Sequence, residues 1–277
     1  MNSPWAAPTP PRWPPAGWFP DPAGTPSLRY WDGVRWTDFR AQARPAREPF
    51  ATLPVAASVT ALVVTIVSLT MSRFVVEWLA DYRWPIAIYV AIAGVIGYGP
   101  LLVCCRVVVN RWGTGSMRND LGFRFRPVDL GWGPLTWVAC VCLQVVVAII
   151  IYALNIPVVS NTEGISKLSG NRGYIISFAI LAVVAAPIVE ELVFRGVVLR
   201  GFASRMPAWS SVGLQGILFG SAHIDPIRGM GNIGLVMILS AVGIVLGGAA
   251  YLIRRLAPTM ISHAITNTIA VIFTLTR

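Results

Sequence analysis

Seven apolar segments dominate the sequence between residues 53 and 275. Each has close to the roughly 20 residues that an α-helix needs to cross the hydrocarbon core of a bilayer. Only 12% of the residues are charged, whereas an ordinary soluble domain carries about 25%. The sequence therefore predicts an all-α polytopic membrane protein, a bundle of about seven transmembrane helices at residues 53–71, 85–109, 134–156, 174–198, 209–224, 233–253 and 258–275.

Arginine is concentrated in every second connection between these segments. Basic residues mark the cytoplasmic side of a membrane protein, so the pattern predicts a multi-pass protein of the cell membrane with a cytoplasmic N-terminus. The segment at 209–224 is short, and we expect it to be surrounded by protein or to cross only part of the bilayer. The arginines of the basic connections are Arg40, Arg44 and Arg47; Arg106, Arg111, Arg118, Arg124 and Arg126; Arg200 and Arg205; and Arg254 and Arg255.

The net charge of +10 does not indicate nucleic-acid binding. Most of the basic residues flank apolar segments, so this charge predicts the lipid bilayer as a partner and no nucleic acid. The cysteines lie within apolar runs, where they behave as small buried hydrophobic residues and not as a disulfide framework. They are Cys104, Cys105, Cys140 and Cys142.

The first 52 residues differ in composition from the rest of the chain. Residues 1–15 are rich in proline, which predicts a disordered leader. Residues 16–40 are rich in tryptophan, and Asp32-Gly33 between aromatic and β-branched residues predicts a β-hairpin. Residues 41–52 predict a basic linker to a membrane domain at 53–277.

The segment 16–40 resembles a small Trp-rich module of unknown function that precedes many bacterial membrane proteins. Three interpretations of it stay open. An aromatic hairpin can dock on a proline-rich peptide, it can lie at the lipid interface, or it can be a small cap whose tryptophans pack only on each other. The sequence does not predict the partner of this module.

Two carboxylates and a guanidinium lie inside the fourth segment, in the stretch Glu190-Glu191-Leu-Val-Phe-Arg195. Ionisable residues are costly at this depth and mark functional sites. Residues four apart share a helical face, so Glu191 lies beside Arg195 and the two charges neutralise each other. Glu190 is rotated by about 100° and has no cation on its own helix, which suits a general base. Pro187, one turn earlier, predicts a kink or a loosened turn with room for water.

Two later segments carry further polar residues at helical spacing, Phe219 with His223 and His263 with Asn267. A rise of about 1.5 Å per residue places Glu190, both histidines and the asparagine about 10–20 Å from the cytoplasmic helix ends. They can therefore converge. A single buried histidine or asparagine often only joins helices by hydrogen bonds, but four such groups at similar depth favour one functional site.

Together, Glu190-Glu191-x-x-x-Arg195, Phe219-x-x-x-His223 and His263-x-x-x-Asn267 resemble the motifs of the CPBP intramembrane proteases. This family includes the CAAX prenyl endopeptidases and bacterial Abi proteins linked to bacteriocin processing or self-immunity. The resemblance covers residues 185–270, and the glycine-rich stretch 243–248 fits it as well.

This resemblance implies a glutamate protease, an intramembrane endopeptidase formed by residues 53–277. Glu190 and His223 would activate a water molecule for attack on a peptide carbonyl, and His263 with Asn267 would stabilise the oxyanion. The substrate would be a membrane-embedded or lipid-associated peptide or protein. The residues that would support the site are Glu191, Arg195 and Phe219.

We expect no cofactor. If the protein used zinc, Glu190, His223 and His263 would be the ligands, but the helix-borne His-Glu-x-x-His signature of zinc peptidases is absent. Two other classes of function stay open. The chain can be a non-catalytic membrane partner in immunity or assembly, or a proton-coupled transporter, because buried glutamate and histidine also build proton relays.

Overall fold

The computed structural model describes residues 14–25, 27–42, 50, 53–159, 170–225 and 229–275. The chain forms two compact units, Met1–Pro49 and Phe50–Arg277. Residues 1–13 of the predicted leader, and 43–49 and 51–52 of the predicted linker, lie outside the described residues, so the states expected for them stay predictions.

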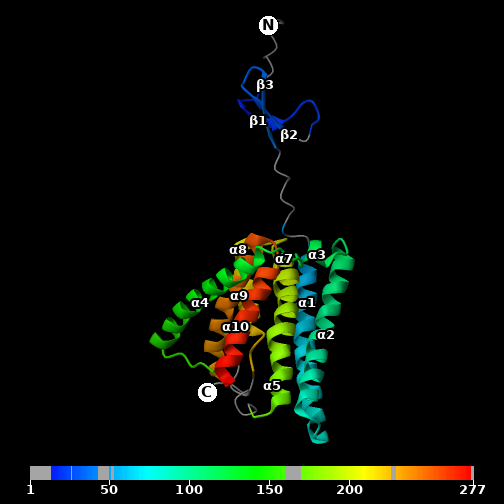
Figure 1. Ribbon diagram of the computed structural model, residues 1–277, viewed down its shortest axis with the longest axis vertical. Helices are drawn as coiled ribbons and strands as arrows, with labels where there is room; N and C mark the ends of the chain where they lie inside the picture. The colour runs from blue at the N-terminus through cyan, green and yellow to red at the C-terminus, as the bar shows by residue number, and fades with distance from the viewer. Residues whose placement is uncertain are drawn as a thin grey trace, which may run out of the picture. The chain divides into compact units, whose positions relative to one another are not determined.

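The first unit contains a three-stranded antiparallel sheet (Figure 1). Its strands, in sheet order, are β1 (Gly17–Pro20), β2 (Ser27–Trp31) and β3 (Trp36–Gln42). Asp32-Gly33 lie in the turn between β2 and β3, as the sequence predicts, and Gly33 has a φ of 100° that favours glycine. The Asp32 carboxylate accepts the N–H groups of Val34 and Arg35 at 2.8 and 2.7 Å. Beyond the predicted hairpin, β1 adds a third strand on the free edge of β2.

One face of this sheet holds a small aromatic core. Trp31 is 6% exposed, and its Nε1 donates to the carbonyl of Pro14 at 3.0 Å. The ring of Trp36 lies edge-on to the rings of Trp31 and Phe19, with centroids 5.3 and 6.3 Å apart. Such pairs add about 0.5–1.5 kcal/mol to the burial of their surface, which matters because few other side chains in the described part of this unit are buried.

The carboxylate of Asp21 holds the connection between β1 and β2. It accepts the N–H of Ala23 at 3.0 Å and the hydroxyl of Thr25 at 2.9 Å, and Arg40 Nε lies 3.2 Å away. The hydrogen bond from Ala23 is the largest cause that holds the pKa of Asp21 below its ordinary value of 3.8, and Thr25 and Arg40 act in the same direction.

We expect the first unit to lose stability in acid through Asp21. A carboxyl whose pKa is lowered by folding stabilises the fold above its unfolded pKa, and this contribution is lost as the pH falls through the folded value, below 3.8. Hydrogen exchange of residues 14–42, corrected for the intrinsic rate, should speed up in that range. Asp21→Asn should exchange faster already at neutral pH and respond less to acid, whereas Asp38→Asn, at an exposed carboxylate, should resemble the wild type. Equal acid responses of the wild type and Asp21→Asn would contradict this role.

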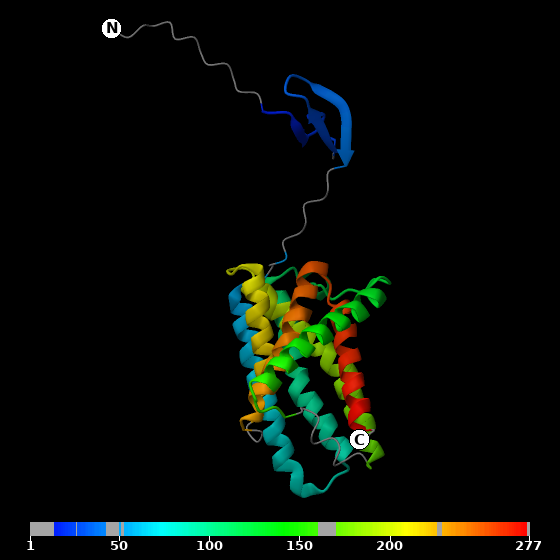
Figure 2. The ribbon, with the colours of Figure 1, turned by 90° about the vertical axis from the view of Figure 1, so that its left-hand side faces the viewer.

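The second unit is a helical bundle (Figures 1 and 2). In the described part of the chain, six helical stretches are long and apolar enough to cross a membrane. The fifth predicted segment folds as α8, which at 14 residues is too short for this and agrees with the expectation of a short helix. The helices are α1 (Val55–Leu79), η1 (Ala80–Tyr82), α2 (Ile86–Trp112), α3 (Met117–Asp120), α4 (Asp129–Ala153), α5 (Arg172–Ala179), η3 (Ile180–Ala185), α6 (Ala186–Glu191), η4 (Leu192–Val198), α7 (Leu199–Phe202), α8 (Ala208–Ser221), α9 (Gly231–Ile253) and α10 (Ala257–Leu275).

Two helices begin or end away from the predicted boundaries because of charged residues. α1 continues past residue 71 to Leu79, since Arg73 and Glu77 pair at 2.9 Å on its exposed side and do not end the helix. α4 begins at Asp129, before Pro134, and the Asp129 carboxylate accepts the N–H of Arg126 at 2.8 Å. Both helices therefore include charged residues beyond the ends of the predicted apolar segments.

The stretch that carries the glutamates is the centre of the second unit. Residues 172–202 form one continuous helical run, in which the π-helical turns η3 and η4 lie on either side of α6. All seven residues of η4 are buried. A π-helical turn contains one extra residue and is frequent at functional sites. The loosened turn predicted near Pro187 takes this form.

The backbones of α8 and α9 approach each other closely, and α8 also contacts the central run. A Cβ atom at Gly216 would lie 2.8 Å from the Ile244 nitrogen, and one at Gly243 would lie 2.8 Å from the Gly216 Cα. Only glycine allows this approach. Phe219 of α8 separately contacts Phe194 of η4, with ring centroids 5.2 Å apart.

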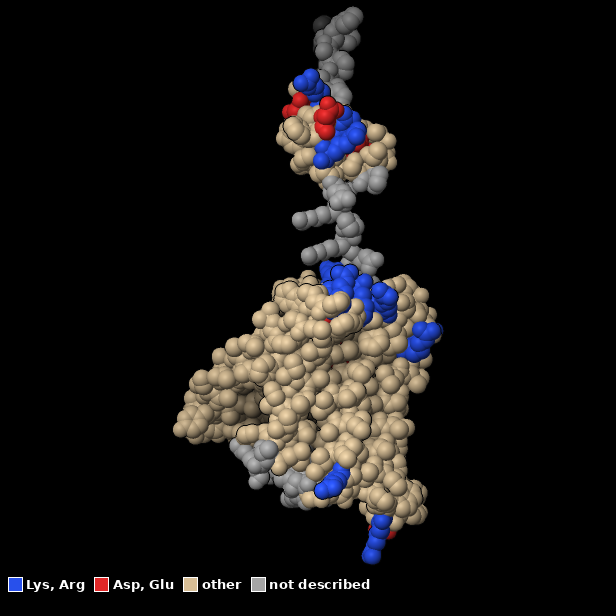
Figure 3. All heavy atoms as spheres, in the orientation of Figure 1, with Lys and Arg blue, Asp and Glu red and all other residues tan. Residues whose placement is uncertain are grey.

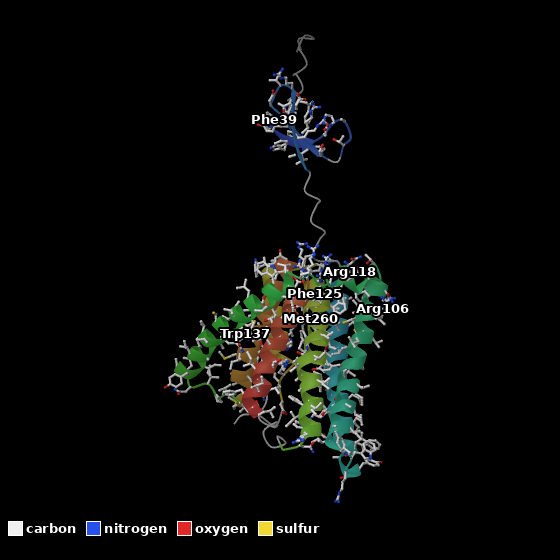
Figure 4. The ribbon with its side chains drawn as sticks, in the orientation of Figure 1. Phe39, Arg106, Arg118, Phe125, Trp137 and Met260 are labelled. Atoms are coloured by element: carbon white, nitrogen blue, oxygen red, sulfur yellow. The ribbon has the colours of Figure 1, made fainter. Side chains whose placement is uncertain are left out.

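Basic side chains gather at one end of the second unit (Figure 3), where Figure 4 labels Arg106 and Arg118. Arg255, which follows α9, forms an ion pair with the buried Asp129 at the start of α4. Its Nε lies 3.0 and 3.1 Å from the two carboxylate oxygens. This pair fixes one end of α4, which crosses the bundle obliquely (Figure 2).

Candidate active site

Glu191 and Arg195 form the ion pair that their spacing predicts. Arg195 Nη1 donates to Glu191 Oε1 at 2.8 Å, and both side chains are fully buried. Nη2 of Arg195 also donates to the carbonyl of Gly243 in α9, at 3.4 Å. A buried charge is tolerated when it is paired and hydrogen-bonded, so this pair joins the central run to α9.

Phe219 lies at the junction of the motif residues. The Arg195 guanidinium lies 4.2 Å from the centre of its ring, in cation–π geometry. The rings of His223 and His263 lie edge-on to it, with centroids at 5.0 and 5.8 Å. Phe219 is 1% exposed. Its ring therefore sets the spacing between the ion pair and both histidines.

His263 of α10 lies between the two carboxylates. Its Nδ1 is 3.1 Å from Glu191 Oε1, and its Nε2 is 3.8 Å from Glu190 Oε2. The side chain is 7% exposed. Two ring nitrogens directed at two carboxylates fix the plane of the imidazole. His263 therefore lies beside Glu190, as the sequence suggests, and also contacts Glu191.

Glu190 takes its second contact from α2. The hydroxyl of Tyr98 donates to Glu190 Oε1 at 2.9 Å, between residues 92 positions apart. The other oxygen, Oε2, is buried and has no hydrogen-bond partner among the described residues. A buried carboxylate oxygen without a donor is costly. Glu190 is thus held on one side, with the other oxygen left as an acceptor.

A cavity of about 190 Å³ connects Glu190 with His223. Tyr98 and Phe194 also line it, and it is large enough for several water molecules. His223 Nδ1 lies 2.9 Å from the Phe219 carbonyl, one turn earlier in the chain. If that nitrogen carries the proton, Nε2 is the acceptor that remains. The described lining of this cavity includes neither His263 nor Asn267.

Asn267 contacts the loosened turn before Glu190. Its Nδ2 donates to the carbonyl of Ala182 in η3 at 2.7 Å. Within this π-helical turn the N–H of Ala186 bonds to the carbonyl of Leu181, so the carbonyl of Ala182 would next require the N–H of residue 187. Pro187 has none. The Asn267 amide therefore takes the place of the missing donor, and its second hydrogen remains for another acceptor.

The zinc alternative names Glu190, His223 and His263 as ligands, and the two histidines lie differently with respect to Glu190. His263 approaches Glu190, whereas His223 reaches it through the shared cavity. In the described parts of the chain, no group of three or more His, Cys, Asp and Glu side chains is arranged to hold a metal ion.

Tyr98 is the contact that sequence reasoning missed. It lies in α2, outside the motif-bearing segments, within Gly97-Tyr98-Gly99-Pro100. A polar aromatic residue flanked by glycines and proline in a spanning helix is a weak indication of close packing or function. Only the fold places it beside Glu190.

Residues 172–269 match the family model described as Type II CAAX prenyl endopeptidase Rce1-like. The chain carries an Rce1-like domain. The family match supports a CAAX-protease-like intramembrane peptidase at family level, and the apolar helices make the chain a multi-pass membrane protein. All three motifs of the site lie within the Rce1-like domain, whereas Tyr98 lies outside the matched residues.

The N-terminal unit matches a different family. Residues 16–49 match the model described as Protein of unknown function (DUF2510). Comparisons with curated proteins and with solved structures found no match for the chain. Among these comparisons, only the match of residues 172–269 bears on activity.

Proposed function

We propose that the chain is an intramembrane endopeptidase in which Glu190 and His223 activate a water molecule to hydrolyse a peptide bond. The observation that supports this is the orientation of the Glu190 carboxylate. One oxygen is held by Tyr98, and the other is a buried acceptor beside a cavity that His223 also lines. A carboxylate that accepts a proton from water in such a cavity acts as a general base.

His263 and Asn267 stabilise the oxyanion in this proposal. Nδ1 of His263 lies 3.1 Å from Glu191 Oε1, and Nε2 lies on the side of Glu190, 3.8 Å from that carboxylate, where an N–H on Nε2 is the donor to the oxyanion. Asn267 contributes the amide hydrogen that Ala182 does not use. Donors fixed in advance, in a site with little water, lower the energy of a developing negative charge.

The substrate in this proposal is a membrane-embedded or lipid-associated peptide or protein. Glu190, His263 and Asn267 lie on helices long and apolar enough to cross the bilayer, so a substrate must enter from it or lie against it. In this proposal the basic end of the second unit (Figure 3) faces the cytoplasm of a cell membrane. By the rule for positive residues, the chain also begins on the cytoplasmic side.

A cleavage assay in proteoliposomes, with a library of membrane-associated peptides, separates the classes of function. Cleavage supports the peptidase. Cleavage that EDTA abolishes and added zinc restores would favour a metal held by Glu190, His223 and His263 over direct activation of water by Glu190 and His223. Binding of peptides without cleavage would favour a non-catalytic immunity or assembly partner, and proton-coupled flux without cleavage would favour a transporter.

We expect Tyr98→Phe to lower kcat about tenfold and to leave KM unchanged. The hydroxyl contacts Glu190 and not the substrate, and a hydrogen bond to a charged group contributes about 1.5–3 kcal/mol. Steady-state kinetics on a cleaved library peptide measure this. Tyr89→Phe is the matched control, because Tyr89 lies on the same helix as Tyr98 but its hydroxyl donates to the Leu79 carbonyl at the end of α1. A kcat within twofold of the wild type would show that Tyr98 does not position Glu190.

A further inference from the structure

Three arginines lie close together at the basic end of the second unit. Arg200 is in the last turn of the central run, Arg254 directly follows α9, and Arg124 lies in the loop between α3 and α4. The guanidinium groups of Arg200 and Arg254 share the ring of Phe50, with Cζ atoms 4.4 and 5.9 Å from its centre. Arg124 lies within electrostatic reach of Arg200. Arg124, Arg200 and Arg254 are named the arginine cluster.

The loop that carries Arg124 packs directly on this cluster because residue 122 is glycine. Gly122 has a φ of 74°, and a Cβ atom there would lie 2.7 Å from Arg200 Nη2 and 2.9 Å from the carbonyl oxygen of Arg254. The N–H of Leu256 donates to the Gly122 carbonyl at 3.0 Å. These contacts fix the loop against the ends of α7 and α9, two residues before Arg124.

The positive charge of the cluster exceeds the negative charge around it. Among the described acidic residues, Asp120 acts on Arg200. Its carboxylate already accepts hydrogen bonds from Thr114 and Ser116. Residues 43–49, which precede the second unit in the chain, add two arginines and one glutamate, so the neighbouring sequence does not supply the missing negative charge. Partly buried like charges are costly unless an anion is bound among them.

The cluster also holds more hydrogen-bond donors than the described acceptors satisfy. The Nε atoms of Arg124 and Arg200 are buried and have no partner among the described residues. Arg200 is only 4% exposed, and its Nη1 donates to the carbonyl of Phe50 at 3.0 Å. Arg124 and Arg254 are less deeply buried, so a ligand can reach the cluster through them. Phosphate is the anion whose oxygens accept from several guanidinium groups at once.

Exposed aromatic rings beside Arg124 favour a lipid as the source of this phosphate. Phe123 is 43% exposed and Phe125, labelled in Figure 4, is 57% exposed. The cluster lies at the ends of two helical stretches long and apolar enough to cross a membrane, Arg172–Phe202 and Gly231–Ile253. Lipid headgroups lie at this level. Basic groups that contact a headgroup and apolar rings that contact acyl chains together fit an anionic amphiphile.

We propose that the arginine cluster binds the phosphate of an anionic phospholipid, whose acyl chains contact Phe123 and Phe125. This site is separate from the proposed catalytic site, because no residue of the cluster is among the described lining of the cavity that Glu190 and His223 share. The bound phosphate neutralises the cluster and joins the end of the central run to the loop before α4. The site does not depend on whether the chain cleaves peptides.

Native mass spectrometry of the full-length protein in a neutral detergent tests this site. Phosphatidylglycerol is titrated, with phosphatidylcholine of the same acyl chains and inorganic phosphate as comparisons, and the affinity of the tightest bound copy is measured. Arg124→Gln and Arg254→Gln, on different elements, should each weaken phosphatidylglycerol binding about tenfold, because each removes a charge-assisted hydrogen bond. Phe125→Ser should weaken it as well. Arg118→Gln removes an exposed arginine from the same end and is the matched control, which should bind like the wild type. Unfolding midpoints without lipid show that the variants are folded.

Three results would overturn the proposal. Equal weakening in Arg124→Gln, Arg254→Gln and Arg118→Gln would indicate a diffuse attraction to the whole basic end. Equal affinities of the wild type for phosphatidylglycerol and phosphatidylcholine would show that the cluster does not select an anionic lipid. Inorganic phosphate that binds as tightly as phosphatidylglycerol, with no effect of Phe125→Ser on either, would assign the cluster to a soluble phosphate compound.

Discussion

Arg195→Met is expected to destabilise the second unit by about 3–5 kcal/mol, because it leaves the Glu191 carboxylate buried without its cation. Glu191 is fully buried, and of its two oxygens only Oε1 has hydrogen-bond partners among the described residues, namely Arg195 and His263. Methionine has a similar length and keeps an apolar contact with the Phe219 ring. The measurement is a reversible unfolding titration in detergent.

The double variant Glu191→Leu/Arg195→Met separates loss of pairing from loss of packing. It removes both charges, and apolar replacements of a buried ion pair are often tolerated. It should recover most of the stability, with a remaining deficit of about 1–3 kcal/mol because His263 Nδ1 loses its acceptor. Arg195→Met within about 1 kcal/mol of the wild type, or a double variant no more stable than the single one, would contradict this account of the pair.

The features that sequence analysis predicted correctly are local. Glu191 and Arg195 are four residues apart on one helix, so their pairing follows from helical geometry alone. The turn at Asp32-Gly33 follows from the backbone preference of glycine. The spanning helices follow from lengths of apolar sequence, and the short α8 from the same criterion.

The contacts that sequence analysis did not predict join residues far apart in the chain. Tyr98 and Glu190 are 92 positions apart, and Asn267 and Ala182 are 85 apart. The motif spacing indicates which face of its helix a residue occupies, but not which neighbouring helix covers that face. The contact of Asn267 also depends on a π-helical turn, which apolar periodicity does not reveal.

The third strand of the first unit was missed for a related reason. β1 is only four residues long, and it contains a glycine and a proline, which are uncommon in strands. Pairing with β2 on an edge tolerates them. Pairing with β2 therefore makes this segment a strand, although its residues disfavour a strand locally.

Glu190→Gln is expected to lower the cleavage rate about a thousandfold, within the range of general-base contributions. Glutamine has nearly the same shape and keeps an oxygen that accepts the hydrogen bond of Tyr98, but it cannot take a proton from water. The fold should therefore survive the change. Glu77→Gln, at an exposed glutamate of α1, makes the same chemical change away from the cavity and should cleave like the wild type.

Cleavage of one library peptide by the wild type, Glu190→Gln and Glu77→Gln in the same proteoliposome preparation tests the central claim most directly. The account predicts that Glu190→Gln alone loses about three orders of magnitude in rate while all three proteins unfold at the same denaturant concentration. A Glu190→Gln variant that cleaves within twofold of the wild type would show that Glu190 does not activate the water.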